Sequence, residues 1–326
     1  MVITVTSYGT KLRRNGRRIA VEGKEGQRQE FPVCEVDGLV LSVPCGLTSE
    51  LLTLCAEEDV PVTMLGRNGS PIWRVEPFAA GGSALLRRRQ LTLADRPEGL
   101  VLVKGLLSDK LDARIRVLRR LAARRTGERS GALLRAADEM ERIREKIRGV
   151  EAASVNECRG TLQGWEGNAG RVYFSAIAGL IPEAGGFTRR GRGAEAGRFN
   201  QMLNYACGVL YRELTDLCRL AGLDPCIGVM HTDVPGRPSL VCDLTEPFRG
   251  EIEAAVCGLF VRRRVRAEHF EEDRLSAQGK RLLMEALEKT LGGKDGLRKG
   301  MERRVASLAA SLRGEGKEDE AKCIAG

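Results

Sequence analysis

The spacing of apolar residues changes once along this chain, and no other feature limits its fold as much. In the first part, short runs rich in Val, Ile and Thr are broken by Gly, Asn or Pro, which is typical of β-strands. Beyond Ala79–Ser83 the apolar residues recur every three to four positions, which is typical of helices. The sequence therefore predicts an α+β protein: a small β-rich domain over residues 1–80, followed by a larger all-α domain over residues 81–326.

The β-rich domain is predicted to be β-sandwich-like and to contain one helix, from Thr48 to Glu58. Thr48 or Ser49 supplies the hydroxyl that caps this helix. Asn15-Gly16 and Asn68-Gly69 tolerate positive φ and predict tight hairpin turns. The predicted strands are Val2–Thr6, Arg18–Val21, Phe31–Val36, Leu39–Val43, Val60–Met64 and Ile72–Val75.

The all-α domain is predicted to have several helices and one Gly- and Arg-rich loop over residues 185–197. Gly222 is well placed to end one of the long helices, because glycine readily adopts the left-handed backbone of a helix terminus. The polar tail from Gly314 onward is expected to fray. The predicted helices are 100–125, 130–148, 154–180, 199–220, a segment from Ser239 onward, 251–266, 279–291 and 297–313.

Charged residues are also distributed unevenly between the two predicted domains. Residues 1–80 contain nine Lys and Arg against ten Asp and Glu, whereas the remaining residues contain 44 against 34. The first domain therefore has a net charge of −1, and the helical domain has all of the basic excess behind the chain's formal net charge of +9. This asymmetry favours a polyanion such as nucleic acid as the partner of that domain. Aromatic residues make up only 4% of the chain, which argues against a single-strand binder built on base stacking.

Several classes of protein are excluded or disfavoured. The first residues lack the basic and apolar regions of a signal peptide, and no apolar run reaches the length of a membrane span. The ten cysteines form no C-x-x-C pair, which argues against structural zinc. We expect reduced thiols in a cytoplasmic protein that has no membrane partner.

Few residues are left to carry chemistry. The chain has two histidines, no G-x-S-x-G motif and no phosphate-binding G-x-x-x-x-G-K-[ST] loop. Acidic residues within the basic helical domain remain. Glu166 lies between Gly164 and Gly167 in a predicted helix, where two glycines cost about 1 kcal/mol each. Small neighbours would let a bulky, charged ligand approach the carboxylate; the alternative is an exposed Glu on a flexible helix.

A histidine and two further carboxylates follow. Asp243 and Glu246 come twelve and fifteen residues after His231 and would share one face of a helix. Pro247 disfavours helix at Glu246 and predicts a kink there. The alternatives are a hydrogen-bonded loop histidine and a solvated acidic edge, although Phe248 and other apolar neighbours place the pair beside buried surface.

One histidine with two or three carboxylates, and no thiolate pair, suits Mg²⁺ or Mn²⁺ better than zinc. A hard cation in a basic domain favours phosphodiester chemistry, because it neutralises a phosphate oxygen and lowers the pKa of an attacking water or hydroxyl. The spacing alone leaves open that these are the scattered carboxylates of any helical protein.

Longer motifs surround these residues. They are Leu85–Gln90, Trp165-Glu166-Gly167 with Tyr173-Phe174, Phe199–Tyr205, Gly222–Pro225, His231, and the most specific piece, Ser239–Arg249. In this combination and order, over nearly the whole chain, the sequence resembles the CRISPR-associated integrase family, the universal metal-dependent endonuclease of spacer acquisition. The overall length and the insert Asp233–Pro238 are most similar to the type I-C branch.

The resemblance implies an activity and a site. Glu166, His231 and Glu246 match the divalent-metal ligands of the family and would be the catalytic residues, with Asp243 as a supporting acid. In the family, the 3′-hydroxyl of a short DNA fragment, the future spacer, attacks a phosphodiester of the CRISPR repeat with the help of the metal. The rivals are a metal nuclease that acts on branched or single-stranded DNA without integration, and a non-catalytic DNA-binding scaffold.

The resemblance also implies partners. Members of the family form homodimers, mainly through the β-rich domain, and two dimers flank a small dimeric partner encoded in the same operon. The nearly neutral first domain fits a role in protein contacts, and the basic helical domain fits a role in DNA contacts.

Candidate DNA contacts are arginines. Arg249 follows the acidic pair and is a possible phosphate contact; a surface Arg near a helix end is the alternative. The Arg-rich loop supplies Arg189, Arg190 and Arg192. A basic helix is a further candidate track, although such runs are usually solvated. Its residues are Lys104, Arg114, Arg119, Arg120, Arg124 and Arg125.

Overall fold

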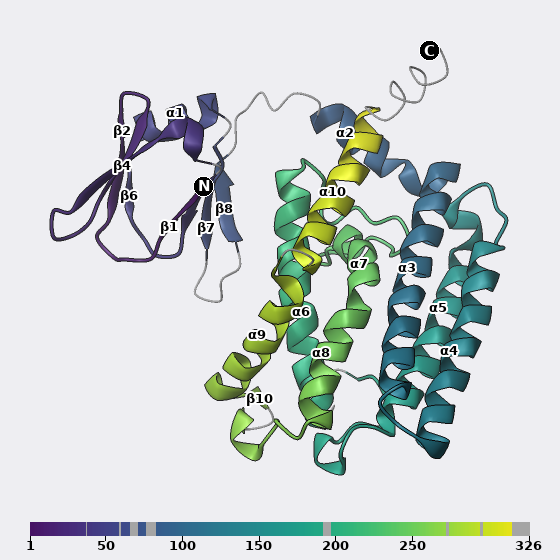
Figure 1. The fold of residues 1–326 in the computed structure, drawn as a ribbon. Helices are drawn as coiled ribbons and strands as arrows, with labels where there is room; N and C mark the ends of the chain where they lie inside the picture. Colours follow the sequence, from purple (N-terminus) through teal and green to yellow (C-terminus); the bar gives the residue numbers. More distant parts are fainter. Residues whose placement is uncertain are drawn as a thin grey trace, which may run out of the picture. The chain divides into compact units, whose positions relative to one another are not determined.

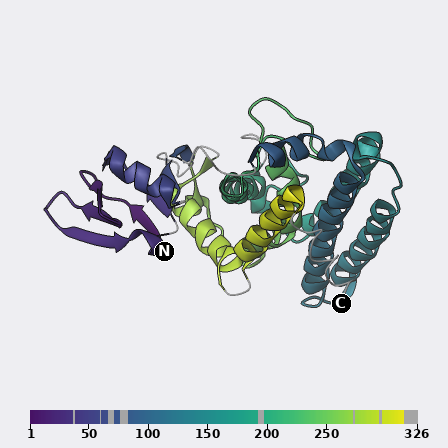
Figure 2. The same cartoon turned by 90° about the horizontal axis from the view of Figure 1, so that it is seen from above.

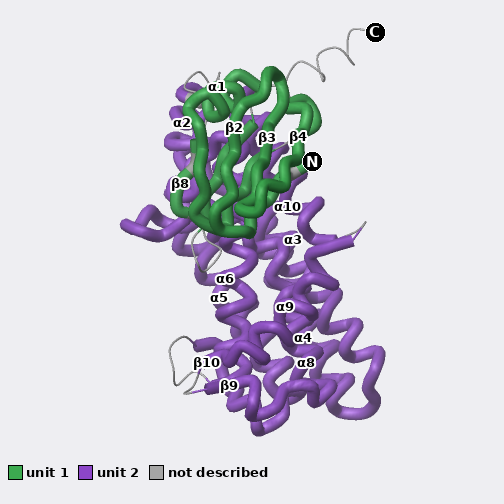
Figure 3. Tube along the Cα trace, turned by 90° about the vertical axis from the view of Figure 1, so that its left-hand side faces the viewer, with its two compact units in different colours: residues 1–83 green, residues 84–326 purple. Residues whose placement is uncertain are grey.

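Strands fill the first part of the chain and helices the second, so the predicted fold class is confirmed. The chain divides into two compact units, residues 1–83 and 84–326, which Figure 3 shows in different colours. Each unit has its own hydrophobic core. The computed structural model describes residues 1–36, 38–58, 60–65, 71–75, 83–191, 197–271, 274–293 and 296–314.

Two four-stranded sheets form the first unit (Figure 1). The first sheet has the order β1-β5-β7-β8, in which only the β7–β8 pair is antiparallel. The second has the order β4-β3-β2-β6, in which only the β2–β6 pair is parallel. The strands are β1 Val2–Val5, β2 Lys11–Asn15, β3 Arg18–Glu22, β4 Arg28–Pro32, β5 Gly38–Leu41, β6 Gly46–Leu47, β7 Val62–Leu65 and β8 Pro71–Val75.

The helix of this unit, α1, spans Ser49–Glu57, and Thr48 rather than Ser49 is its N-cap, because the Thr48 hydroxyl accepts from the Leu51 N–H. The predicted turn after Asn15 is present: Asn15 pairs with Arg18, and Gly16 between them has a φ of 60°. Asn68-Gly69 lies outside the described residues.

One predicted strand of the first unit is wrong in its second half. The prediction ran from Phe31 to Val36, but β4 ends at Pro32 and Val33–Glu35 form a 3₁₀ turn. The Val33 N–H still donates to Arg17 O, one position beyond the Arg18–Pro32 pair, but the Val36 N–H then donates back to Val33 O and closes the 3₁₀ turn. The chain therefore leaves the sheet at this point.

Helix α3 is central in the second unit. It lies between α8 on one side and α4 and α5 on the other, and α3, α4 and α5 run side by side in Figures 1 and 2. None of the described helices combines the length and apolar character that crossing a bilayer requires. The helices are α2 Ser83–Leu91, α3 Pro97–Ala122, α4 Gly127–Arg148, α5 Val155–Ala178, α6 Gly197–Leu220, α7 Ser239–Thr245, α8 Arg249–Val261, α9 Ala277–Leu291 and α10 Leu297–Arg313.

A close approach between α8 and α3 fixes the start of α8. A Cβ added to Gly250 would lie 2.9 Å from Ala113 Cβ and 3.1 Å from the Ala113 carbonyl carbon. The missing side chain therefore lets the two helix backbones come together. Glu246 lies just before α8 and Lys110 lies on α3, so this contact brings both residues into one region of the unit.

Candidate functional site

Three elements meet around a buried lysine. Lys110 comes from α3, Glu166 from α5, and Glu246 from the 3₁₀ turn η5 (Glu246–Phe248). The Lys110 ammonium forms ion pairs with both carboxylates. Lys110 is 1% exposed and Glu246 is 4% exposed, whereas the Glu166 side chain is 31% exposed, so the cluster is buried at Lys110 and Glu246 and reaches solvent at Glu166. The structure thus brings two of the three predicted ligands together through a residue that the sequence analysis did not select.

Both carboxyl groups of this cluster are held ionised. Burial by itself would raise the pKa of Glu246, but Arg249 and Lys110 outweigh it and hold the pKa at about 2. Arg249 Nε lies 3.2 Å from Glu246 Oε1. Burial likewise opposes ionisation of Glu166, and the Lys110 charge outweighs it, so the pKa of Glu166 is lowered. Both side chains therefore carry a negative charge at neutral pH.

Pro247 determines the backbone conformation at Glu246. Helix α7 ends at Thr245, the turn η5 follows, and α8 begins at Arg249. Because proline cannot donate an N–H within a helix, the α-helical pattern is interrupted where the sequence predicted a kink. Asp243 and Glu246 consequently serve different partners, although they are only three residues apart.

Asp243 organises the histidine. Its buried carboxylate accepts the backbone N–H groups of Val229 at 2.7 Å, Met230 at 3.1 Å and His231 at 3.0 Å. The same carboxylate lies 2.6 Å from Nδ1 of His231. Nδ1 is thereby engaged, and Nε2 is the ring nitrogen left for another ligand. A carboxylate that orients a histidine in this way is common beside metal ions.

The predicted ligands do not surround a single point. Among the described residues, no three His, Cys, Asp or Glu side chains lie close enough together to hold a metal ion. Glu166 and Glu246 share Lys110, whereas His231 is paired with Asp243. The chemistry of the donors nevertheless fits a hard divalent cation, since Glu246 Oε2 is buried and accepts no hydrogen bond.

A cavity of about 370 Å³ borders the ionic cluster. Glycines on the α5 wall leave it open: a Cβ on Gly167 would meet nothing within 4 Å. Glu166 and Glu253 are the only acidic residues among the described residues that line it. This excess of positive charge suits a phosphate-bearing ligand. The cationic residues of the wall are Lys110, Arg114, Arg171, Arg189, Arg190 and Arg249.

The predicted arginines differ in their surroundings. Arg189 is exposed at the cavity. Arg190 is partly buried and donates to Gly191 O at 2.9 Å and Asn200 Oδ1 at 3.0 Å. Arg192 lies outside the described residues. The alternative that Arg249 is a surface residue is wrong: its side chain is 18% exposed, and besides contacting Glu246 it donates to the Tyr211 hydroxyl.

Comparison with known proteins identifies the family. Residues 3–289 match the family model described as CRISPR associated protein Cas1. The chain belongs to the CRISPR-associated Cas1 family. A relative from Rhodospirillum rubrum, a CRISPR-associated endonuclease Cas1, is 32% identical over 95% of this chain and 89% of its own length. A second, from Archaeoglobus fulgidus, is 30% identical over 90% and 89%.

Solved Cas1 structures share the fold. A CAS1 protein from Thermotoga maritima superposes with a TM-score of 0.64 at 23% identity, over 96% of this chain and 97% of that one. A casposase bound to integration product gives 0.69 at 21% identity, over 97% and 96%. The β-rich unit followed by a helical unit is therefore the Cas1 fold. The assignment to the type I-C branch stays a prediction.

Two cations of this Cas1-family chain were missed or misplaced by sequence analysis. Lys110 was not selected, and Arg114 was placed in a basic helix that was read either as a candidate DNA track or as a solvated face. Arg114 is in fact buried, donates to Glu253 through two hydrogen bonds of 2.9 and 2.6 Å, and lies over the Tyr173 ring. The available signal was helical spacing, since both cations fall among the buried apolar positions of α3, between Leu106 and Leu118.

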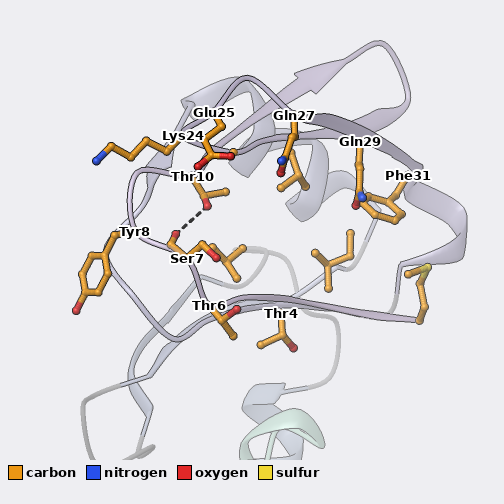
Figure 4. A pocket seen from close by; sticks show the side chains of 15 residues that line it. Thr4, Thr6, Ser7, Tyr8, Thr10, Lys24, Glu25, Gln27, Gln29 and Phe31 are labelled. Carbon is orange, nitrogen blue, oxygen red and sulfur yellow. Dashed lines mark hydrogen bonds between the residues drawn. The ribbon is translucent and has the colours of Figure 1, made fainter.

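A second cavity, of about 610 Å³, lies within the first unit and is drawn in Figure 4. Its labelled side chains are mostly neutral, and Lys24 and Glu25 are the charged ones. Thr10 donates to Ser7 O at 2.8 Å, the dashed line in the figure. With one carboxylate and no histidine among its lining residues, this cavity lacks the set of donors that a divalent-metal site needs.

Proposed function

We propose that this chain is a divalent-metal-dependent DNA endonuclease and integrase, which inserts short DNA fragments into a CRISPR repeat. The 3′-hydroxyl of the fragment attacks a repeat phosphodiester and the repeat strand leaves. One observation carries the proposal: two ionised carboxylates, Glu166 and Glu246, meet beside a cavity whose charged lining residues are mostly cationic. The names of relatives support it, because they include endonucleases and a casposase bound to integration product.

Glu166, Glu246 and His231 are the proposed ligands of Mg²⁺ or Mn²⁺. When bound, such an ion stabilises charge on the phosphate and lowers the pKa of the attacking hydroxyl or water. The remaining work falls to the chain itself. Asp243 fixes the orientation of His231. Arg189 and the other cations of the cavity wall hold DNA phosphates without reading sequence.

Partners follow from the same proposal. DNA is the substrate, both as the incoming fragment and as the repeat. Structural neighbours include a TtCas1-DNA complex and a partial Cas6-RT-Cas1–Cas2 complex. We assign the β-rich unit to homodimer contacts and the helical unit to DNA, with two dimers flanking a small dimeric partner such as Cas2. The negative charge of the first unit suits protein contacts better than DNA contacts.

A strand-transfer assay tests this function. Purified chain, with and without Cas2, is incubated with a short duplex, a repeat-containing plasmid and Mg²⁺ or Mn²⁺. We expect joining that EDTA abolishes, and a loss on the order of 100-fold or more in Glu166→Ala, His231→Ala and Glu246→Ala. The matched control is Glu139→Gln, an exposed carboxylate on α4 that pairs with Arg142, which should join at the wild-type rate.

Two other results would replace the proposal. Cleavage of branched or single-stranded DNA without any joining would favour the nuclease that does not integrate. DNA binding without strand chemistry in any divalent metal would favour the non-catalytic scaffold. Wild-type joining by one of the three alanine variants would remove that residue from the ligand set.

A further inference from the structure

The proposed function does not explain why a lysine lies between two of the proposed metal ligands. Lys110 has a side chain that is 2% exposed, in the middle of α3. Lysine is almost never fully buried unless it is paired, because removing an ammonium from water is unfavourable. Here the pairing is double: one ammonium serves Glu166 of α5 and Glu246 of η5.

The oxygens of Glu246 decide what this pairing means. Oε1 is occupied by Arg249, whose Nε lies 3.2 Å away. Oε2 forms the ion pair with Lys110, the closer of the two cation contacts of this carboxylate. Because the same ammonium also pairs with Glu166 Oε1, a metal ion that displaces Lys110 gains an oxygen of each carboxylate at once, whereas displacing Arg249 would free an oxygen of Glu246 alone.

The net charge of the cluster also indicates that Lys110 must move when a metal ion binds. Glu166 and Glu246 supply two negative charges, and Lys110 and Arg249 supply two positive charges. The buried cluster is therefore neutral without a metal. A divalent cation added beside an unmoved Lys110 would meet an ammonium of the same sign at very short range, which strongly weakens binding.

We propose that Lys110 is a resident cation that competes with the divalent metal for Glu166 and Glu246. It keeps the two carboxylates together until the metal enters, and it then withdraws from them. This inference rests on the proposed function, because it takes both carboxylates as metal ligands. Lys110 also lines the cationic cavity, and its four-carbon stem is flexible, so the displaced ammonium has a phosphate site within reach.

Mn²⁺ binding to the full chain, without DNA, tests the competition. Free Mn²⁺ is measured by electron paramagnetic resonance for the wild type and for Lys110→Met, which keeps an unbranched four-atom stem and removes the ammonium with its charge. We expect Lys110→Met to bind Mn²⁺ about tenfold more tightly or better, because one competing charge is gone. The matched control is Lys104→Met, also on α3, whose ammonium donates to Val150 O; it should bind as the wild type does.

Glu246→Gln separates failure of this inference from failure of the proposed function. If Glu246→Gln abolishes Mn²⁺ binding but Lys110→Met binds no more tightly than the wild type, Lys110 does not compete and the metal site stands. If no variant shows Mn²⁺ binding that depends on Glu246, the metal site itself is wrong, and the inference is wrong with it.

The unfolding temperature supplies a second test. Lys110→Met leaves the two carboxylates without the ammonium between them, and their repulsion should destabilise the fold. We expect this variant, and Lys110→Gln, to unfold at lower temperature than the wild type in EDTA and to gain more stability than the wild type from saturating Mn²⁺. If both variants stay unfolded in saturating Mn²⁺, the metal cannot take the place of the ammonium, and the proposal is wrong.

Discussion

Four hydrogen-bond donors converge on the Asp243 carboxylate: three consecutive backbone N–H groups and the His231 ring. A carboxylate can serve all four, because both of its oxygens accept. An amide cannot, since its NH₂ group would face N–H donors. An asparagine at position 243 would have nearly the same shape, but it would lack the negative charge and the second accepting oxygen that Asp243 provides.

Asp243→Asn is expected to lower the free energy of unfolding by about 1–3 kcal/mol, because buried donors lose their acceptor. Joining should fall about 10–100-fold, because His231 loses the group that orients it. Urea unfolding and the strand-transfer assay measure the two effects. The control is Asp233→Asn, an exposed residue that accepts one hydrogen bond from Gly228 N at 2.9 Å. Equal losses in both variants would contradict the special role of Asp243.

Sequence motifs selected four acidic or histidine residues as candidates but did not select the lysine that pairs with two of them. Glu166, His231, Asp243 and Glu246 stand in recognisable motifs. Lys110 stands in a long, charge-rich helix, where a basic residue is usually solvated. Only tertiary packing of α5 and η5 against α3 shows that it is enclosed. The separation of the ligands into two pairs likewise depends on backbone geometry that spacing does not contain.

At the scale of elements, small residues set how closely helices approach. Gly250 is the first example, because the Ala113 backbone of α3 occupies the space that a side chain would need. Gly258, two turns further along α8, is the opposite case: an added Cβ would meet nothing within 4 Å. The same substitution can therefore be compared at a packed position, Gly250, and at an open position, Gly258, of one helix.

Gly250→Ala is expected to destabilise the fold by about 1–3 kcal/mol through overpacking, and to reduce joining because the start of α8 carries Glu246 with it. Gly258→Ala should be neutral or stabilising by up to about 1 kcal/mol, since alanine is the better helix former. Thermal unfolding and strand transfer test both. If Gly250→Ala were as stable and as active as Gly258→Ala, the contact would not position the site.

Elements with strong apolar periodicity were predictable. Helices α3, α4, α5 and α6 begin and end within a few residues of the predicted ranges, because each has a continuous buried face. Helix α2 was not predicted, since its basic run Arg87–Arg89 hides any apolar stripe. Strands β2 and β6 were also missed; β2 is mostly charged and β6 has two residues.

At the scale of the whole molecule, the two hydrophobic cores are separate. Leu39 is fully buried in the first, and Leu118 is fully buried in the second. Removing either side chain to Cβ leaves a cavity that costs about 2–5 kcal/mol. Because neither residue belongs to the other core, each substitution should destabilise only the unit that contains it.

Leu39→Ala and Leu118→Ala are therefore expected to shift different unfolding transitions in differential scanning calorimetry, the first that of the β-rich unit and the second that of the helical unit. Metal-dependent stabilisation should accompany only the transition that Leu118→Ala shifts, since the proposed ligands all lie in the helical unit. A single transition that both substitutions lower equally would show that the units unfold together.

The Asp243 carboxylate fixes residues 229–231 through three backbone hydrogen bonds, and this makes the segment that follows tolerant of insertions. Between Thr232 and Ser239 the chain makes an exposed excursion that contains Gly236, and the Ser239 hydroxyl donates to Thr232 O where the excursion closes. Both ends are tied down, so the middle can lengthen or shorten without moving the histidine. A peptide tag or dye-bearing linker inserted between Val234 and Arg237 is thus expected to lie near His231, a proposed metal ligand, without moving it.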